Sequence, residues 1–199
     1  MFSIPGIIHG DFHDENIIVQ IQTIDKSNQV KAGSHSKVPN DGQVIKHAQF
    51  DVSESANDNT NTNDEQYVAT GVIDFGDSFR SYFIFEVAIA ICYLMIEVTL
   101  IDPVDVAGHF LAGYFTHMDL SARELDLLYI CIHRAFAQEF VLGSLKYIDD
   151  PTNHYLVTSQ RNGWKIMRNF WNISKSEVHF KWNCVLQKYN DDYVNLFKS

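Results

Sequence analysis

A long polar stretch, residues 23–66, divides the chain into two parts and limits what it can fold into. The stretch contains the runs DKSNQVKAGSHSKVPNDGQV and SESANDNTNTNDEQ, in which apolar residues are sparse. Such a segment buries too little apolar surface to offset the conformational entropy that ordering costs. We therefore expect a disordered insertion over 23–66, with room for one short strand near 44–50. The fold is then made from residues 1–22 and 67–199.

Short apolar runs lie on both sides of this insertion. Residues 16–21 and 67–73 are rich in β-branched side chains and bounded by polar sequence, a pattern typical of β-strands. If the two strands pair antiparallel, the start of the first lies beside the end of the second. The insertion then falls at the opposite end of the hairpin. A long loop is tolerated there because loop-closure entropy grows only logarithmically with length.

The predicted hairpin would bring two polar side chains together. In the register that pairs Ile17 with Ile73, Asn16 lies next to Asp74. Amide and carboxylate oxygens are ligands that magnesium accepts in proteins. The sequence therefore predicts two oxygen ligands at one end of the hairpin.

From Tyr82 onward, apolar residues recur with helical spacing. Pro103 suits the first turn of one helix, and Ser121 followed by Glu124 has the form of a capping box at the start of another. These elements predict an α+β fold that is mainly α, with one β-hairpin followed by a helical bundle. The helices are expected over 82–100, 103–117, 121–142 (or as far as 147), 153–170 and 174–189.

Charge and cysteine content narrow the class of partner. The chain has 15 Lys and Arg against 25 Asp and Glu, a formal net charge of −10, which opposes binding to nucleic acid and to anionic membranes. The apolar segment 82–101 contains Glu86 and Glu97, and a carboxylate in lipid is costly, so we expect a buried helix there and not a membrane span. The three cysteines are far apart in the sequence. They fit reduced thiols of an intracellular protein better than a disulfide framework or a zinc site.

Two short motifs carry the predicted chemistry. The first is His9-Gly10-Asp11, with Asn16 five residues after the aspartate, and the second is Asp74-Phe75-Gly76. In protein kinases, a loop H-R-D-x-x-x-x-N and a later D-F-G act together in phosphoryl transfer. The loop aspartate accepts the proton of the attacking hydroxyl, and the asparagine and the second aspartate hold magnesium. The matching spacing here, with Gly10 in place of the arginine, predicts Asp11 as the base and Asn16 and Asp74 as magnesium ligands.

Structural interpretations of the same residues stay open. The three motif residues could be turn residues or helix caps, although all three would then coincide in kinase order. Asp77 could reach a metal or a substrate, or cap the helix that follows. We expect His9 and His13 to shape the loop and not to transfer protons.

The motifs resemble those of a known kinase superfamily. Residues 9–17 (HGDFHDENI) and 71–77 (GVIDFGD) look like the corresponding segments of the aminoglycoside phosphotransferases and choline kinases. The stretch 73–97 (IDFGDSFRSYFIFEVAIAICYLMIE) resembles the hydroxylysine kinases within that superfamily more closely, with support from 108–113 and 163–165. The resemblance covers nearly the whole chain outside the insertion.

This resemblance implies a fold, an activity and a site. The fold is the C-terminal lobe of a protein-kinase-like fold. The activity is magnesium-dependent transfer of the γ-phosphoryl group of GTP to the hydroxyl of 5-hydroxy-L-lysine, in the cytoplasm. Asp11 would be the catalytic base, and Asn16 and Asp74 the magnesium ligands. Many relatives steady the catalytic loop with the aspartate of a D-L-A segment, a place taken here by Glu86, and His9, Gly10 and His13 complete the loop.

Only ten residues precede Asp11 in the sequence. The superfamily places a glycine-rich loop and a phosphate-binding lysine on an N-terminal lobe before this point. The sequence alone therefore predicts a catalytic lobe without its N-terminal lobe, inactive or nearly so as an isolated chain. The choice between GTP and ATP and the oligomeric state do not follow from these residues.

The acceptor residues are predicted from chemistry alone. An amino acid with two amines suits an acidic pocket, for which Asp77 and Glu139 are candidates, and its carboxylate suits a cation such as Arg134. The alternative is that Glu139 and Arg134 are simply the polar face of a packed helix.

Other functions compete with this one. The chain could phosphorylate another small amino alcohol or an aminoglycoside-like substrate, or it could be an inactive kinase-fold binding module. A metallophosphoesterase is a further alternative, since Asp11-Phe12-His13 has the form D-x-H, but no later G-N-H-[DE] block follows. A helical scaffold with no small-molecule role would show no effect of magnesium or nucleotide on its melting temperature.

Overall fold

The computed structural model of the 199-residue chain describes residues 4–24, 64–190 and 196–197. Two compact units are distinguished. One consists of Met1–Asp14 with Phe75–Ser199, and the other of Glu15–Asp74. We call them the helical unit and the hairpin unit. The described chain is mainly helical, as the sequence predicts, and has two small antiparallel sheets where one hairpin was expected.

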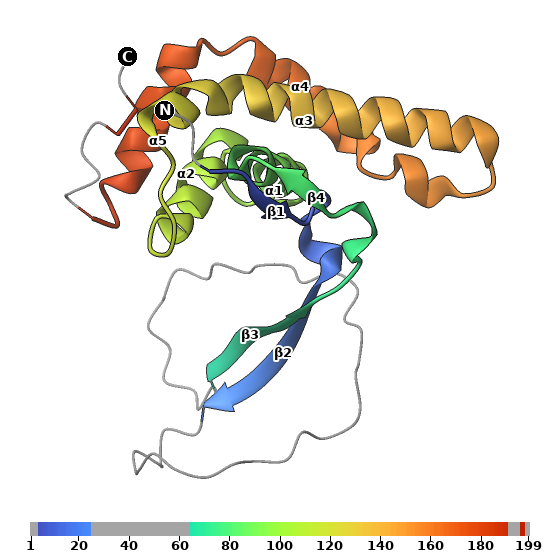
Figure 1. Ribbon diagram of the computed structural model, residues 1–199, viewed down its shortest axis with the longest axis horizontal. Helices are drawn as coiled ribbons and strands as arrows, with labels where there is room; N and C mark the ends of the chain where they lie inside the picture. The colour runs from blue at the N-terminus through green and yellow to red at the C-terminus, as the bar shows by residue number, and fades with distance from the viewer. Residues whose placement is uncertain (1–3, 25–63, 191–195, 198–199) are drawn as a thin grey trace. The chain divides into compact units, whose positions relative to one another are not determined.

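The hairpin unit contains the two predicted strands. Strand β2 (Ile17–Ile24) pairs antiparallel with β3 (Asp64–Val72), which confirms the predicted pairing (Figure 1). Both strands run further than expected, because their outer ends include residues assigned to the insertion. The rest of that insertion, 25–63, and the short strand expected near 44–50 lie outside the described residues.

The register of the hairpin differs from the predicted one. Ile17 pairs with Val72 and not with Ile73. Further along, the register shifts again between Ile18 and Val19, which leaves Thr70 as an extra residue on β3. The hydroxyl of Thr70 donates a hydrogen bond to the carbonyl of Ile18 at 3.3 Å. A bulge of this kind changes the pairing by one residue and cannot be read from the alternation of side chains alone.

The helical unit has a second, smaller sheet that the sequence does not predict. Strand β1 (Gly6–Ile8) pairs antiparallel with β4 (Phe79–Ser81). Strands of three residues are too short to show a period of two, which explains why they were missed. The pairing of Ile8 with Phe79 fixes the start of the loop that follows β1 beside the turn that precedes β4.

The helices agree closely with prediction. The capping box is present, since the Ser121 side chain accepts from the backbone N–H of Glu124 and the Glu124 carboxylate accepts from that of Ser121. The segment predicted as one helix over 153–170 is divided into a 3₁₀ turn and an α-helix. The elements are α1 (Phe83–Glu97), α2 (Pro103–Tyr114), α3 (Ala122–Asp149), η3 (His154–Val157), α4 (Gln160–Trp171) and α5 (Lys175–Leu186).

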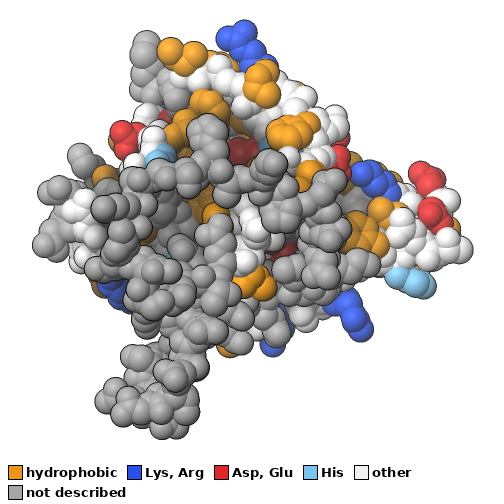
Figure 2. Space-filling model, turned by 90° about the horizontal axis from the view of Figure 1, so that it is seen from below, with side chains coloured by type: hydrophobic (Ala, Val, Ile, Leu, Met, Phe, Trp, Pro, Cys, Tyr) orange, Lys and Arg blue, Asp and Glu red, His pale blue; other side chains and the backbone are white. Residues whose placement is uncertain are grey.

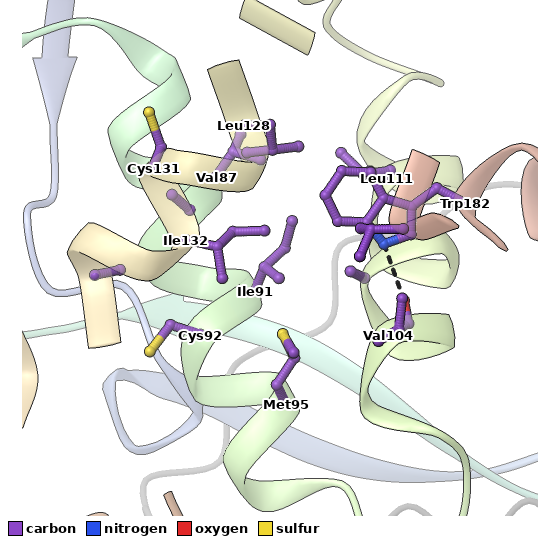
Figure 3. Close-up of a cluster of buried hydrophobic side chains, with 14 of the residues drawn as sticks. Val87, Ile91, Cys92, Met95, Val104, Leu111, Leu128, Cys131, Ile132 and Trp182 are labelled. Carbon is purple, nitrogen blue, oxygen red and sulfur yellow. Dashed lines mark hydrogen bonds between the residues drawn. The ribbon is translucent and has the colours of Figure 1, made fainter. Parts of the chain in front are cut away.

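The core of the helical unit is built around α1. This helix packs against α2 and α3, and α2 packs against α5. Figure 3 shows Ile91 and Met95 of α1 facing side chains of the neighbouring helices, and both are fully buried. The buried indole of Trp182 donates to the carbonyl of Val104 at 3.0 Å, which satisfies its one polar group and ties α5 to α2. The expected buried helix over 82–100 is therefore the centre of the core.

Basic side chains of the described residues are few on the face of the molecule drawn in Figure 2. On the face drawn in Figure 2, the Lys and Arg side chains of the described residues are spread singly and form no continuous patch. Among the helices described here, none is both long enough and apolar enough to cross a membrane.

Candidate active site

The loop after β1 needs a glycine at position 10. Gly10 has a φ of +87°, a region that favours glycine, and a Cβ there would lie 2.3 Å from the carbonyl oxygen of Asp77. The hydroxyl of Ser78 also donates to the carbonyl of His9 at 3.4 Å. The loop is thus held against the turn Phe75–Asp77 and the residue that follows it.

Glu86 binds the same loop from the first turn of α1. Its Oε1 accepts the backbone N–H of His9 at 3.2 Å, and its Oε2 accepts that of Gly10 at 2.9 Å. Bonds from N–H groups to a carboxylate are charge-assisted and stronger than those between neutral groups. The carboxylate of Glu86, which the sequence predicts to steady this loop, thus reaches both amides.

Asp11 follows directly and is held from two sides. Its Oδ2 lies 3.5 Å from Nε2 of His13, and its Oδ1 lies 3.4 Å from the hydroxyl of Tyr93. The hydrogen bond from His13 is the main cause that lowers the pKa of Asp11. Because its pKa is lowered, the Asp11 carboxylate is ionised at neutral pH. Its side chain is 34% exposed, so an incoming group can reach it.

His13 is the cationic partner of this carboxylate. Its side chain is 9% exposed and its ring stacks on that of Tyr93, with centroids 4.5 Å apart. Burial on its own would lower the pKa of His13, but the hydrogen bonds and charges of Asp11 and Asp14 outweigh burial and raise the pKa from 6.5 to about 9. His13 is therefore protonated at neutral pH, and it holds Asp11 by charge as well as by hydrogen bonding.

Tyr93 connects Asp11 to a second carboxylate. The Tyr93 hydroxyl donates to Oε2 of Glu139 at 2.6 Å, and the hydroxyl of Ser159 donates to the other oxygen, Oε1, at 2.8 Å. Burial, followed by the charge of Glu139, raises the pKa of Tyr93 far above its usual range. The phenol thus keeps its proton and acts as a donor between two acidic groups.

These groups line a small, open recess of about 30 Å³ within the helical unit. Helices α1 and α3 supply most of its lining, which includes the carboxylates of Asp11 and Glu139. The lining residues are Gly10, Asp11, Ile89, Cys92, Tyr93, Ala135, Gln138 and Glu139.

The predicted magnesium ligands belong to the hairpin unit. The backbone N–H of Ile73 donates to the carbonyl of Asn16 at 3.0 Å, so Asn16 lies across from Ile73 and beside the residue that follows it, Asp74. The backbone of Asp74 is left-handed, with a φ of +62°. The one-residue change of register therefore leaves the two predicted ligands at the same end of the hairpin.

Two other predicted substrate residues, Asp77 and Arg134, do not line the recess. Asp77 is exposed in the 3₁₀ turn Phe75–Asp77, and the N-cap position of α1 is occupied by Tyr82, so Asp77 does not cap that helix. Arg134 is exposed and lies over the ring of Phe85, with its guanidinium carbon 5.0 Å from the ring centroid. Neither lines the recess.

Sequence reasoning missed Tyr93 and Ser159. Tyr93 lies inside an apolar helix, where a phenol hydroxyl needs a hydrogen-bond partner. Its place in the sequence could therefore have indicated a polar contact. Ser159 gave no signal, because its role depends on how the segment before α4 meets α3. Within the described ranges, no group of three or more His, Cys, Asp or Glu side chains is placed to hold a metal ion.

Comparison with curated proteins finds kinases of a small molecule. The matched relatives are named hydroxylysine kinase. The protein from Danio rerio is 37% identical over 118 residues, which is 59% of this chain and 33% of the relative. The protein from Mus musculus is 28% identical over 187 residues, which is 94% of this chain and 40% of the relative. The protein from Xenopus laevis is 34% identical over 119 residues.

The chain spans between 31% and 40% of the length of these relatives. No protein-family model matches it, and no solved structure matches it. The similarity nevertheless extends over nearly all of this chain in the Mus musculus comparison, so it includes the helical unit and the hairpin strands alike.

Proposed function

We propose that this protein is a small-molecule kinase that transfers the γ-phosphoryl group of a nucleoside triphosphate to the hydroxyl of 5-hydroxy-L-lysine. The similarity to proteins named hydroxylysine kinase supports the reaction class and the acceptor. The observation that carries the proposal for this chain is the open carboxylate of Asp11 at a recess that contains a second carboxylate. A kinase of a basic amino alcohol needs both groups, one for the hydroxyl and one for an amine.

Asp11 acts as the base. As the acceptor oxygen forms a bond to the γ-phosphorus, its proton moves to the Asp11 carboxylate. The bond from the γ-phosphorus to the bridging oxygen breaks, and the nucleoside diphosphate leaves with that electron pair. A carboxylate with a lowered pKa is a weak base, but phosphoryl transfer has a loose transition state in most analyses, so orienting the hydroxyl matters more than base strength.

The residues around Asp11 keep it in position. Glu86 holds the backbone of the loop through the N–H groups of His9 and Gly10. His13 holds the carboxylate itself and offsets part of its charge. These residues support the catalytic loop without contacting the acceptor.

Asn16 and Asp74 are proposed to hold Mg²⁺. Their place at one end of the hairpin supports the assignment, because an amide oxygen and a carboxylate are hard ligands of the kind that magnesium binds. When bound, the ion neutralises negative charge on the phosphates. Either GTP, as the resemblance to the hydroxylysine kinases implies, or ATP could be the donor.

The acceptor is proposed to bind in the recess of the helical unit. Glu139 is the one predicted acceptor residue that lines it, and its carboxylate suits an ammonium group. Arg134 lies on α3 one turn before Gln138, which also lines the recess, and is proposed to meet the acceptor's carboxylate at the rim. The backbone carbonyl of Asp77 lies against Gly10. A contact of the Asp77 side chain with the substrate is part of this proposal.

The proposal is tested by phosphoryl transfer in the longest form of the protein that its gene encodes. Purified protein is given 5-hydroxy-L-lysine and either Mg-GTP or Mg-ATP labelled in the γ-phosphate, and labelled phospho-amino acid is counted. Asp11→Asn should lower kcat by about 10²–10⁴-fold, since general-base losses have this size. Nucleotide binding, measured by calorimetry, should be unchanged.

Asp119→Asn is the matched control. Asp119 is exposed in the segment between α2 and α3 and does not line the recess, so the same chemical change there should leave turnover intact. Full activity of Asp11→Asn would exclude Asp11 as the base. Nucleotide binding with no transfer to any amino alcohol would instead favour an inactive kinase-fold binding module.

A further inference from the structure

The hydroxyl of Tyr93 lies between two acidic groups and has one proton to donate. It lies 2.6 Å from Oε2 of Glu139 and 3.4 Å from Oδ1 of Asp11. A phenol has a single proton, so it can make only one full hydrogen bond as a donor. The shorter distance shows that Glu139 receives it, while Asp11 lies at the limit of hydrogen-bonding range.

The surroundings keep the phenol in this position. The ring of Tyr93 is stacked on His13, which is itself bound to Asp11, and Glu139 is fixed at its other oxygen by Ser159. Rotation of the O–H about the bond between the ring and the oxygen, without movement of the ring, would redirect the donated hydrogen bond from one carboxylate to the other. The charged and titratable groups that face this pair are His13, His9 and Cys92.

We propose that Tyr93 is a positioning residue that couples an ammonium group bound at Glu139 to the orientation of Asp11. A cation at Glu139 occupies the oxygen that now accepts the phenol proton. The Tyr93 hydroxyl then turns to Oδ1 of Asp11 and fixes that carboxylate in one orientation. Amine binding thereby prepares the base for the neighbouring hydroxyl.

This inference rests on the proposed function and makes it more specific. The two carboxylates are joined by one phenol oxygen, so they are close to each other. In 5-hydroxy-L-lysine, the amine nearest to the reacting hydroxyl is on the adjacent carbon, and the other amine is three carbons away from the carbinol. The amine next to the hydroxyl therefore suits Glu139 when the hydroxyl lies at Asp11. The site is therefore specific for an amine and a hydroxyl on neighbouring carbons.

The coupling predicts that an acceptor without the amine next to the hydroxyl has a lower kcat as well as a higher KM. The test compares 5-hydroxy-L-lysine with 2-amino-5-hydroxyhexanoic acid, which lacks only the amine next to the hydroxyl. Wild-type protein should prefer hydroxylysine in both kcat and KM. Tyr93→Phe should lower kcat for hydroxylysine by about 10- to 10²-fold, the cost of a misplaced reacting group, with a smaller change in KM. The kcat values for the two acceptors should then be nearly equal.

Two further variants separate coupling from packing. Glu139→Gln should raise the KM for hydroxylysine, and its effect on kcat should not add to that of Tyr93→Phe, since both break the same connection. Tyr129→Phe is the structural control, because it also removes a partly buried tyrosine hydroxyl. The Tyr129 hydroxyl donates to the carbonyl of Ile173 at 2.9 Å. It should lower stability without changing acceptor preference. Additive losses, or a wild-type kcat preference in Tyr93→Phe, would overturn the inference.

A second readout does not depend on turnover. Protein labelled with ¹³C at the ζ carbon of tyrosine reports the hydrogen bond of each phenol, and the Tyr93 signal is identified from its loss in Tyr93→Phe. Saturating hydroxylysine should move this signal, and 2-amino-5-hydroxyhexanoic acid should not. A shift without phosphoryl transfer would leave the coupling standing and refute the proposed kinase. An unmoved signal in a protein that phosphorylates hydroxylysine would refute the coupling alone.

Discussion

The carboxylate of Glu86 accepts the backbone N–H of Gly10 at 2.9 Å, although 76 residues separate the two in the sequence. The bond joins the start of α1 to the loop that carries the proposed base. Because the second oxygen of Glu86 holds the neighbouring amide, one side chain fixes two consecutive peptide groups. The orientation of Asp11, the next residue, therefore depends on a carboxylate that does not line the recess.

Removing this carboxylate should cost both stability and turnover. Glu86→Ala leaves two amide groups without their acceptor, and we expect a loss of about 1–3 kcal/mol in the free energy of unfolding. Glu86→Gln retains one carbonyl oxygen and should be intermediate. Urea denaturation gives these values. Glu177→Ala, at an exposed position of α5, should stay within about 0.5 kcal/mol of wild type. Equal stability of Glu86→Ala and wild type would contradict the structure of the loop.

Gly10→Ala should be more damaging than a glycine substitution elsewhere. A methyl group at this position would lie 2.3 Å from the carbonyl oxygen of Asp77, and the φ of +87° is strained for alanine. We expect a loss of more than about 1 kcal/mol, read as a lower Tm. Gly113→Ala is the matched control. It lies in α2 with nothing within 4 Å of the added methyl, so it should stabilise by about 0.4–1 kcal/mol. The same sign for both substitutions would argue against this backbone.

The pair of His13 and Asp11 predicts a dependence of stability on pH. The pKa of His13 is raised from 6.5 to about 9, so the folded state holds the proton more tightly. The resulting stabilisation is fully present below pH 6.5 and is lost as pH rises through about 9. The stability difference between wild type and His13→Asn should therefore shrink from pH 6 to pH 10, by at most on the order of 3 kcal/mol.

The acidic limb of the same pair runs the other way. The pKa of Asp11 is lowered from 3.8, so its contribution is present above that pH and is lost as pH falls through the folded value. Urea denaturation at several pH values measures both limbs. His117→Asn, at an exposed position between α2 and α3, serves as the control. A difference for His13→Asn that is constant from pH 6 to pH 10 would show that this pair does not form in solution.

Local signals in the sequence account for most of the fold. Helix α3 begins at the predicted capping box, and the hairpin forms between the two predicted apolar runs. The predicted register was wrong from Ile17, which pairs with Val72, and it shifts again at the bulge at Thr70, because a bulge depends on backbone geometry and not on residue type. Strands β1 and β4 were missed since three residues are too few to show a pattern.

The sequence predicted single residues of the candidate site but not the contacts between them. Asp11 and Glu139 were recognised by residue type, one from a motif and the other as an acidic side chain on a helix. Their connection through Tyr93 depends on how α1 packs against α3, and no short-range pattern encodes that contact. Motifs thus report which groups are present along one segment. The distance between groups on different segments is set by packing.

His133 gives a pH dependence of opposite sign to that of His13. It is 4% exposed in α3, and its ring is stacked on Phe170 with centroids 4.6 Å apart. Its Nδ1 lies 2.8 Å from the carbonyl of Tyr129, whereas Nε2 has no hydrogen-bond partner among the described residues. Burial lowers the pKa of His133 below 6.5, because a charge here would be poorly solvated.

A lowered histidine pKa means that the unfolded state binds the proton first as pH falls. The folded state therefore loses stability below about pH 6.5, where the unfolded chain is protonated and the native ring is still neutral. His133→Phe keeps the aromatic contact with Phe170 and removes the titrating group. The stability of this variant relative to wild type should rise steadily from pH 7.5 to pH 5, as measured by urea denaturation. Parallel stability curves over this range would show that His133 is solvated or partnered in the native protein.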